Sequence, residues 1–456
     1  MMNVVIVGAG ELGRHVAEIL SKEKHSVILI DKNSKVLQEV SAHLDIATRH
    51  GSGTDWQLLD DLLEFSPDLF LALTGSDEVN LVACSIAKQM RYPRTIARVR
   101  DSRYTYRTRL DFGQIFDVDY FIGPELLAAH ELLKHITSPS SVTIENFAHG
   151  ALQLRVLQIP ENWQAPAVPL KDFNLSENII VGLIRRTVST KGDKEKMQQV
   201  IFPHGQDILL PGDEVTLIGE REAIATAHEL FGIQEKPVKS VVIAGGSLTG
   251  LHLAELLAHR DLDVSIIEKS FDKCALLAER VPHCTIMHHD ATDPSFLRAE
   301  KVGQADMLVA STNSDEVNGL IGLLGQEVGC TEIQVLLKNT DYMSIATRLG
   351  FRYVVAPKII ATNHILSQLF SGKVTSLISL YENQAEVLEI NVSLQSKVVG
   401  IPLSELGPYL PTDFLIVMIQ NRGRIMIAHG DRVISPGDTI IVVTSPKHVD
   451  EIARIL

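Results

Sequence analysis

The hydrophobic positions near the amino end alternate between two periodicities. Residues 4–7 are apolar at every position, as a strand buried on both faces of a parallel sheet requires. Apolar residues then recur at helical spacing through residues 16–20, and a second apolar run covers residues 27–30. This order of strand, helix and strand predicts the start of a doubly wound α/β sheet.

The spacing of apolar residues changes from alternating strands and helices to a strand-like pattern further along the chain. We expect the remaining strands of the first sheet near Ile46, Leu69, Ile96 and Phe116, and helices that include residues 78–90 and 124–136. After residue 141 the alternation becomes strand-like, which predicts a small β-rich lobe. Proline and glycine in "LPGD", residues 210–213, and in "SPGD", residues 435–438, stand where a type II turn prefers them.

The sequence contains a tandem repeat. The opening pattern returns from Ser240 as "SVVIAGGSLTG", and "SDEVN" at residues 76–80 recurs unchanged at residues 314–318. The tandem duplication predicts two doubly wound Rossmann-type parallel sheets, residues 1–137 and 237–372, each followed by a small β-rich α+β lobe, residues 138–233 and 373–456. A longer segment of the first β-rich lobe, residues 187–199, predicts a mobile hairpin tip, with a partner contact as the alternative.

Three glycines after the first strand point to a nucleotide. Gly8, Gly10 and Gly13 fit G-x-G-x-x-G, which brings a pyrophosphate to the N-terminus of a helix. Asp31 follows Gly10 by twenty-one residues, where the ribose-binding carboxylate belongs, although a plain helix cap stays an alternative. A carboxylate repels a 2′-phosphate, so NAD(H) is favoured over NADP(H). ATP or ADP also present free ribose hydroxyls, and the sequence does not rank these ligands.

Composition narrows the class of protein. With 456 residues we expect two to four domains, and a net charge of −14 disfavours nonspecific binding to nucleic acid. No apolar run approaches eighteen residues, so we expect no membrane span and no signal peptide. The four cysteines lack C-x-x-C spacing, which favours reduced thiols in a cytosolic protein. The segment "HCTIMHHD", residues 283–290, invites a metal site, but we expect a strand with His283 and Cys284 on opposite faces.

Together these features resemble a known family along essentially the whole chain. The lobe order, "VGAGELG", the acid that ends the second strand, "TGSDEVN" and "IARVRD" are similar to the regulatory subunits of Trk potassium-uptake systems, whose repeated unit is the RCK (regulating conductance of potassium) module. The resemblance implies a peripheral subunit at the cytoplasmic face of the membrane that binds NAD(H) and ATP or ADP. It further implies a homotetramer that gates an integral-membrane potassium translocating subunit.

The resemblance also implies the contact residues. In the first copy they are Gly8, Ala9, Gly10, Glu11, Leu12, Gly13, Asp31, Thr74, Gly75 and Arg98. In the second copy they are Gly245, Gly246, Ser247, Leu248, Thr249, Glu268, Thr312 and Asn313. Ser247 adds a Cβ where the middle glycine stood, and Leu336 replaces Arg98, with Lys338 as a candidate substitute. Nucleotide binding by this copy and a purely structural lobe both remain open.

An NAD-dependent oxidoreductase is the alternative from another class of protein. Such an enzyme needs a substrate domain that brings an acid or base to the nicotinamide, and the β-rich lobes offer no recognisable constellation of this kind. We therefore predict no catalytic residues. The helices at residues 124–136 and 357–370 are apolar on more than one face, which predicts subunit packing as well as core burial.

Overall fold

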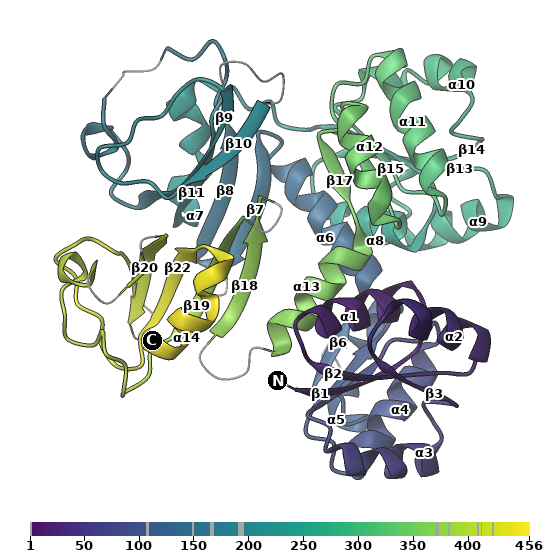
Figure 1. Ribbon diagram of the computed structural model, residues 1–456. Coiled ribbons are helices and arrows are strands. Elements are labelled where there is room, and N and C mark those ends of the chain that lie inside the picture. The colour runs from purple at the N-terminus through teal and green to yellow at the C-terminus, as the bar shows by residue number, and fades with distance from the viewer. Residues whose placement is uncertain are drawn as a thin grey trace. The chain divides into compact units, whose positions relative to one another are not determined.

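The chain folds into two compact units, each built from two separate stretches of sequence (Figure 1). The structure is a computed structural model that describes residues 2–456 except 106–108, 148–149, 165–167, 190–195, 370–373, 382–383, 408–409, 412 and 422–423. We call Met1–Leu133 with Lys239–Ile365 the Rossmann unit, and Lys134–Val238 with Leu366–Leu456 the β unit. Two of the three boundaries between the units fall inside helices α6 (Pro124–Thr137) and α13 (Pro357–Leu369), and the third falls between Val238 and Lys239.

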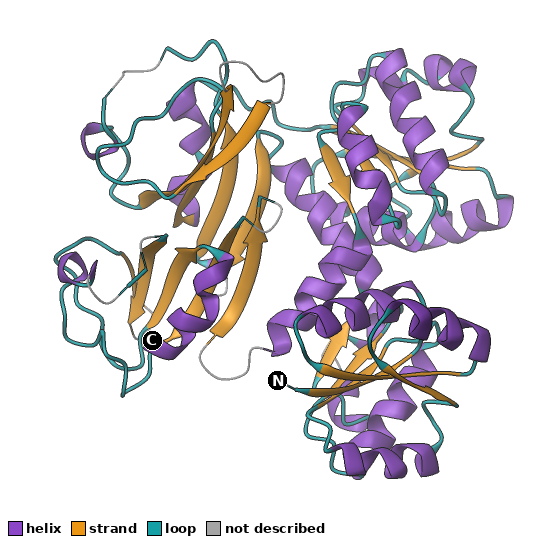
Figure 2. Ribbon diagram, viewed as in Figure 1, coloured by secondary structure: helices purple, strands orange, loops and turns teal. Residues whose placement is uncertain are grey.

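Lobe 1 of the Rossmann unit is a six-stranded parallel sheet in the order β3-β2-β1-β4-β5-β6. Helices flank the strands (Figure 2). Its strands are β1 (Asn3–Val7), β2 (Ser26–Asp31), β3 (Ala47–His50), β4 (Leu69–Ala72), β5 (Thr95–Arg98) and β6 (Tyr120–Ile122). Its helices are α1 (Glu11–Lys22), α2 (Ser34–His43), α3 (Trp56–Asp61), α4 (Asp77–Gln89), α5 (Phe112–Ile115) and α6 (Pro124–Thr137).

Lobe 2 repeats this arrangement with the order β14-β13-β12-β15-β16-β17. The strands are β12 (Ser240–Ala244), β13 (Asp263–Glu268), β14 (Thr285–His288), β15 (Met307–Ala310), β16 (Ile333–Leu336) and β17 (Tyr353–Val355). The helices are α8 (Leu248–Leu257), α9 (Phe271–Arg280), α10 (Pro294–Ala299), α11 (Asp315–Val328), α12 (Met343–Arg348) and α13 (Pro357–Leu369). In each lobe the strand order reverses between the first and fourth strands, which creates the crevice where doubly wound folds bind ligands.

The repeated sequence motifs are largely helix caps. Ser76 accepts a hydrogen bond from the amide of Val79 and begins α4, and Ser314 caps α11 in the same way. Asp55 and Asp293, the acids of the "TD" repeats, cap α3 and α10. Identity between the two copies therefore marks the positions where each lobe starts a helix.

One packing contact explains why the repeat varies beside these caps. A Cβ on Gly53 would overlap the side chain of Val7 at the end of β1. The second copy has Ala291 at the position of Gly53, and there Ala244 stands in the place of Val7. The smaller strand residue leaves room for the additional methyl group, so the two exchanges compensate each other in volume.

The two lobes contact one another within the Rossmann unit. The side chain of Gln334, fully buried on β16 of lobe 2, donates to the carbonyl oxygen of Leu132 on α6 at 3.3 Å. Helix α6 is thereby packed by its own chain on a face beyond the lobe 1 core. Subunit packing by the apolar side chains of this helix stays a prediction.

The β unit contains two antiparallel sheets of identical order. One holds β7 (Ser141–Phe147), β8 (Leu152–Gln158), β9 (Ile179–Ser189), β10 (Lys196–Ile201) and β11 (Glu214–Glu220), with helix α7 (Arg221–Ala225). The other holds β18 (Val374–Leu380), β19 (Ala385–Asn391), β20 (Phe414–Asn421), β21 (Arg424–Ile427) and β22 (Thr439–Thr444), with helix α14 (Val449–Ile455). Leu154 and Val156 of the first sheet share a buried core with Val387 and Val443 of the second.

Most sequence expectations about the fold are confirmed. Gly212 and Gly437 have φ of +84° and +82°, as the third position of a type II turn requires. The strand expected near Phe116 was wrong by a few residues, because residues 112–115 form α5 and the strand follows at 120–122. The hairpin strands of residues 187–199 are present, while its tip, residues 190–195, lies outside the described residues. The exact domain limits stay predictions.

The described helices were also compared with the dimensions of a bilayer. Among them, none is both long enough and apolar enough to span a membrane.

We predict that one hydrogen bond between the sheets stabilises the β unit. The hydroxyl groups of Tyr381 and Thr216 lie 2.6 Å apart, and the guanidinium of Arg185 lies 4.7 Å from the centre of the Tyr381 ring. Tyr381→Phe should lower the free energy of unfolding by about 0.5–1.5 kcal/mol. Chemical denaturation of Tyr381→Phe, Thr216→Val and the double variant measures this. Strictly additive single effects would contradict a direct bond between the two hydroxyls.

Candidate functional site

The first phosphate loop joins β1 to α1 at the carboxyl edge of the lobe 1 sheet. Gly8 has a φ of +102°, a conformation that favours glycine, and its amide donates to the carbonyl of Ile30 at 2.8 Å. Helix α1 begins after Gly10 without any side-chain cap. An uncapped helix N-terminus presents backbone N–H groups that bind phosphate well. The loop has the geometry that our phosphate prediction requires, and ligand contact stays a prediction.

The three glycines of this loop have different roles. A Cβ on Gly13 would overlap the carbonyl oxygen of Gly8, so the third glycine allows the helix to approach the turn. A Cβ on Gly8 would lie 2.9 Å from the backbone of Leu73 and Thr74 at the end of β4. In contrast, no atom lies within 4 Å of a Cβ placed on Gly10. The fold therefore requires Gly8 and Gly13, while Gly10 keeps a space open.

Asp31 ends β2 beside this loop. Its carboxylate accepts hydrogen bonds from the amide of Ala9 at 2.6 Å and from the amide of Asn33 at 2.8 Å. Helix α2 is capped by Asn33, so the alternative that Asp31 is a plain helix cap is wrong. Each carboxylate oxygen has two acceptor positions, and each uses one of them here. The half-buried Asp31 can therefore still accept hydrogen bonds from ribose hydroxyls.

Thr74 and Gly75 lie at the carboxyl end of β4, next to the turn at Gly8. The amide and hydroxyl of Thr74 both donate to the side-chain oxygen of Asn80, at 2.9 and 2.7 Å. Asn80 is fully buried on α4, and its side-chain nitrogen donates to the carbonyl of Arg98 at 2.9 Å. This one amide joins the ends of β4 and β5.

Sequence reasoning missed the role of Asn80, although the signal was present. It is the last residue of "SDEVN", and its counterpart Asn318 makes the same contacts with Thr312 and with the carbonyl of Leu336. A buried asparagine repeated unchanged in two helices is typical of a polar group that the backbone requires.

Arg98 forms an ion pair that the sequence did not predict. Its guanidinium lies 2.7 Å from Glu125 at the start of α6, and the two side chains are only 17% and 19% exposed. The Nε atom of Arg98 is buried and has no acceptor among the described residues. This ion pair is therefore largely shielded from water, and phosphate binding by Arg98 stays a prediction.

The second phosphate loop has the same turn but different contacts. Gly245 has a φ of +109°, while the hydroxyl of Ser247 caps α8 by accepting from the amide of Gly250 at 3.2 Å. Glu268, 7% exposed, accepts from the amides of Gly246 and Ser270, both at 2.8 Å. Glu268 thus repeats the two contacts of Asp31, and the cap by Ser247 is what distinguishes this loop from the first.

Two further predicted residues of lobe 2 lie at the end of β15. Thr312 is held by Asn318, as described above, and the carbonyl of Asn313 accepts from the ammonium of Lys338 at 3.1 Å. Leu336 is fully buried, so lobe 2 has no guanidinium in the place of Arg98.

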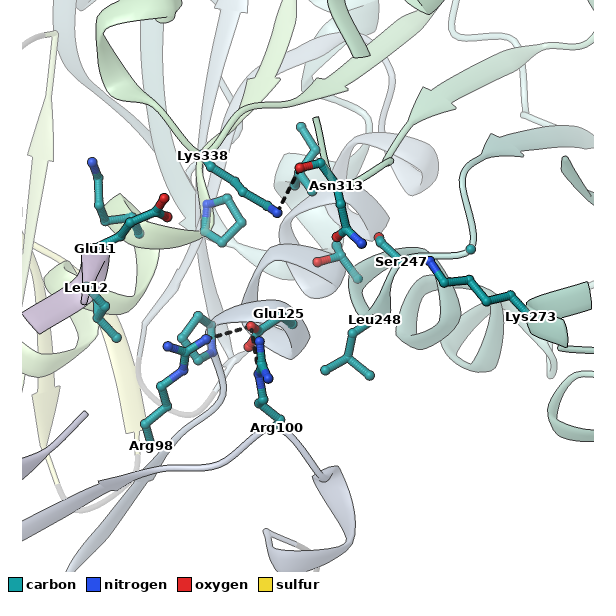
Figure 3. Close-up of a pocket in the computed structure, with 16 residues that line it drawn as sticks. Glu11, Leu12, Arg98, Arg100, Glu125, Ser247, Leu248, Lys273, Asn313 and Lys338 are labelled. Carbon is teal, nitrogen blue, oxygen red and sulfur yellow. Dashed lines mark hydrogen bonds and ion pairs between the residues drawn. The ribbon is translucent and has the colours of Figure 1, made fainter. Parts of the chain in front are cut away.

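A cavity of about 580 Å³ lies where the two phosphate loops of the Rossmann unit meet (Figure 3). Lobe 1 lines it with Glu11, Leu12, Arg98, Arg100, Pro124 and Glu125. Lobe 2 lines it with Gly246, Ser247, Leu248, Thr249, Lys273, Asn313, Leu336, Lys338, Pro357 and Lys358. Five of these side chains are cationic and two are carboxylates, so the lining carries a positive formal charge.

Only some of the predicted nucleotide-contact residues line the cavity. Those that line it are Glu11, Leu12, Arg98, Gly246, Ser247, Leu248, Thr249 and Asn313. Asp31 and Glu268 are not among the lining residues, and Gly75 lines a neighbouring cavity of about 450 Å³ together with Arg100 and His252. Sequence reasoning missed Arg100, Lys273 and Lys358. Only Arg100 had a signal, because it belongs to the quoted segment "IARVRD".

The histidine-rich segment of residues 283–290 was predicted to be a strand. Residues 285–288 form β14, but His283 and Cys284 precede it in a turn, so our argument from opposite strand faces was wrong. The Nε2 atom of His283 lies 3.0 Å from the carbonyl oxygen of Ala254. Among the described residues, no group of three or more His, Cys, Asp or Glu could hold a metal ion.

Comparison with protein families gives matches to both kinds of lobe. The TrkA-N domain matches residues 4–115 and 241–357, and the TrkA-C domain matches residues 167–232 and 387–456. The chain is 29% identical over 461 residues to "Trk system potassium uptake protein TrkA homolog 1" of Methanosarcina mazei, covering 99% of each chain. It is 27% identical to "Trk system potassium uptake protein TrkA" of Halomonas elongata, covering 100% of this chain and 98% of that one.

Solved structures share the fold. The GsuK RCK domain superposes with a TM-score of 0.62 at 16% identity, covering 100% of this chain and 94% of that chain. A GsuK channel described as bound to NAD gives a TM-score of 0.60 at 16% identity over 100% of this chain and 79% of that chain. GsuK described as bound to ADP gives 0.51 at 12% identity over 81% and 69%.

We predict that one glycine of the first loop is needed for folding and another for nucleotide binding. Gly13→Ala should destabilise lobe 1 by about 1–3 kcal/mol, because the added Cβ meets backbone that cannot move away. Gly10→Ala should fold with unchanged thermal stability but bind NADH more weakly, because the Cβ projects into open space. Thermal melts and calorimetric titration measure both effects. Equal NADH affinity of Gly10→Ala and wild type would contradict phosphate approach at this loop.

Proposed function

Because the chain belongs to the TrkA family, as the matches of its TrkA-N and TrkA-C domains establish, we propose that it is a nucleotide-binding regulatory subunit. It binds an adenine nucleotide in lobe 1 and gates an integral-membrane potassium translocating subunit. It acts as a homotetramer attached peripherally to the cytoplasmic face of the membrane. The named relatives are potassium uptake proteins, which supports potassium as the transported ion.

The observation that carries the proposal is the pairing of an uncapped helix with an acid. Helix α1 has no side-chain cap, and Asp31, at the end of β2, is hydrogen-bonded to the same loop and has further acceptor positions. A nucleotide presents a phosphate and a ribose diol at this spacing, so one ligand can satisfy both. The carboxylate favours NAD(H), and ATP or ADP can use the same adenosine contacts. The GsuK structures described with NAD and with ADP support both ligand classes.

Gating requires that ligand identity changes the shape of the Rossmann unit. Lobes 1 and 2 contact one another beside the loops, so two nucleotide states can favour two different lobe angles. Moving a two-state assembly from mostly closed to mostly open needs about 5.5 kcal/mol of differential affinity. Several coupled lobes in an oligomer share this requirement. An oxidoreductase is not supported, since no described feature brings an acid or base to a nicotinamide.

We predict that Asp31 determines nucleotide affinity. Asp31→Ala should weaken NADH binding about tenfold or more, because charge-assisted hydrogen bonds to the ribose are lost. Asp31→Asn keeps one acceptor oxygen, so it can hold only one of the amides of Ala9 and Asn33, and it should bind NADH with an intermediate affinity. Wild type should also prefer NADH to NADPH, and Asp31→Ala should lose part of this preference.

Calorimetric titration of the full chain measures these affinities, and thermal melts verify folding. The exposed Asp45 on the same lobe offers a matched control, since Asp45→Ala changes the net charge equally. Unaltered NADH affinity in Asp31→Ala would remove the ribose assignment.

A further inference from the structure

The cavity between the phosphate loops is positive in a protein that is negative overall. The chain carries a net charge of −14, whereas five cations and two carboxylates line this cavity. Its volume of about 580 Å³ lies within the range of small-molecule sites. Collecting like charges costs electrostatic free energy unless an anion is bound between them. The charge imbalance therefore indicates an anionic ligand.

The lysines of lobe 2 have donors to spare. Among the described residues, the ammonium of Lys338 donates only to the carbonyl oxygen of Asn313, which carries no charge. Lys358 is half-buried, and no carboxylate partner of Lys358 or Lys273 is found among the described residues. In Figure 3, Lys338 and Arg98 approach the cavity from opposite sides. An ammonium group has three donors, so each lysine can contact more than one anionic oxygen.

Lobe 1 adds a buried donor to this set. The Nε atom of Arg98 has no acceptor among the described residues, while the neighbouring Nη2 atom of the same guanidinium edge donates to Oε1 of Glu125. The Oε2 atom of Glu125 is likewise buried without a hydrogen-bond partner among the described residues. A buried N–H without an acceptor is destabilising. Arg100 adds a second guanidinium, 3.8 Å from the same carboxylate. One glutamate is thus shared between two arginines, which leaves part of their charge uncompensated.

Lobe 2 also differs from lobe 1 in how its own loop is satisfied. Ser247 caps α8, whereas Glu268 accepts from the amide of Gly246 in the same way as Asp31 accepts from that of Ala9. In lobe 1 no side chain caps α1. This difference at the helix cap assigns the nucleotide crevice to lobe 1. Lobe 2 contributes through its cationic side chains that line the cavity.

From these contacts we infer that the cavity is an anion site shared by the two lobes, which binds a polyphosphate group through Lys338 and Lys358 of lobe 2. The inference rests on the proposed function where the group is the terminal phosphate chain of a nucleotide held by lobe 1. A free inorganic polyphosphate has the same chemistry. In either case, lobe 2 contributes to binding without holding a nucleotide of its own.

Inorganic tripolyphosphate is the probe, titrated calorimetrically into the full chain at low salt. Lys338→Gln/Lys358→Gln should weaken its binding about tenfold or more, and Asp31→Ala should leave it unchanged. The matched control is Lys397→Gln/Lys447→Gln, which removes two exposed lysines of the β unit and changes the net charge equally. Equal affinity of the first double variant and wild type, or no binding by wild type, would overturn the inference.

Further measurements separate the outcomes. Displacement of bound tripolyphosphate by ATP identifies a nucleotide as the source, whereas binding without displacement identifies the free anion. Because burial, and then the charge of Lys358, lower the pKa of His15, a bound polyanion should raise the pKa of His15 in an NMR titration. The two proposals can fail separately. If Asp31→Ala keeps its NADH affinity but tripolyphosphate binding still depends on both lysines, only the proposed nucleotide crevice is refuted.

Discussion

In both lobes the first helix packs so closely against the turn before it that no Cβ fits between them. A methyl group on Gly13 would overlap the carbonyl of Gly8, and one on Gly250 would lie 2.6 Å from the carbonyl of Gly245. This contact fixes where the helix N-terminus points. The remaining features of the site, namely the open phosphate loop, the acid at the end of the second strand and the shared cavity, depend on it.

The two copies share the residues that hold strand ends and helix starts, but they differ in the residues around the phosphate loops. Asn80 and Asn318 hold the ends of the fourth and fifth strands in the same way, and the capping serines are identical. Around the phosphate loops, by contrast, Gly10 has become Ser247, and the hydroxyl fills a role that is empty in lobe 1. A duplicated fold can therefore divide the work, with one lobe open to a nucleotide and the other supplying positive charge.

Helix α6 connects the buried ion pair of lobe 1 with lobe 2. The ion pair of Arg98 and Glu125 is mostly shielded from water, so its strength depends little on bulk salt. Glu125 stands at the start of α6, whose carbonyl at Leu132 accepts from Gln334 of lobe 2. A change in charge near Arg98 therefore acts at one end of a helix that touches both lobes, which is a physical route for ligand identity to alter their arrangement.

The sequence by itself determined the strand and helix order, the duplication, the positive φ of the turn glycines and the acid beside the first loop. These features are local, since hydrophobic period, glycine spacing and caps act within a few residues. Tertiary structure alone decided that Arg98 pairs with Glu125, that His283 and Cys284 precede their strand, and that lysines 273, 338 and 358 line the cavity that Glu11 and Arg98 also line. These contacts join residues up to several hundred positions apart, and their geometry follows from how two lobes pack, which no periodicity along one chain encodes.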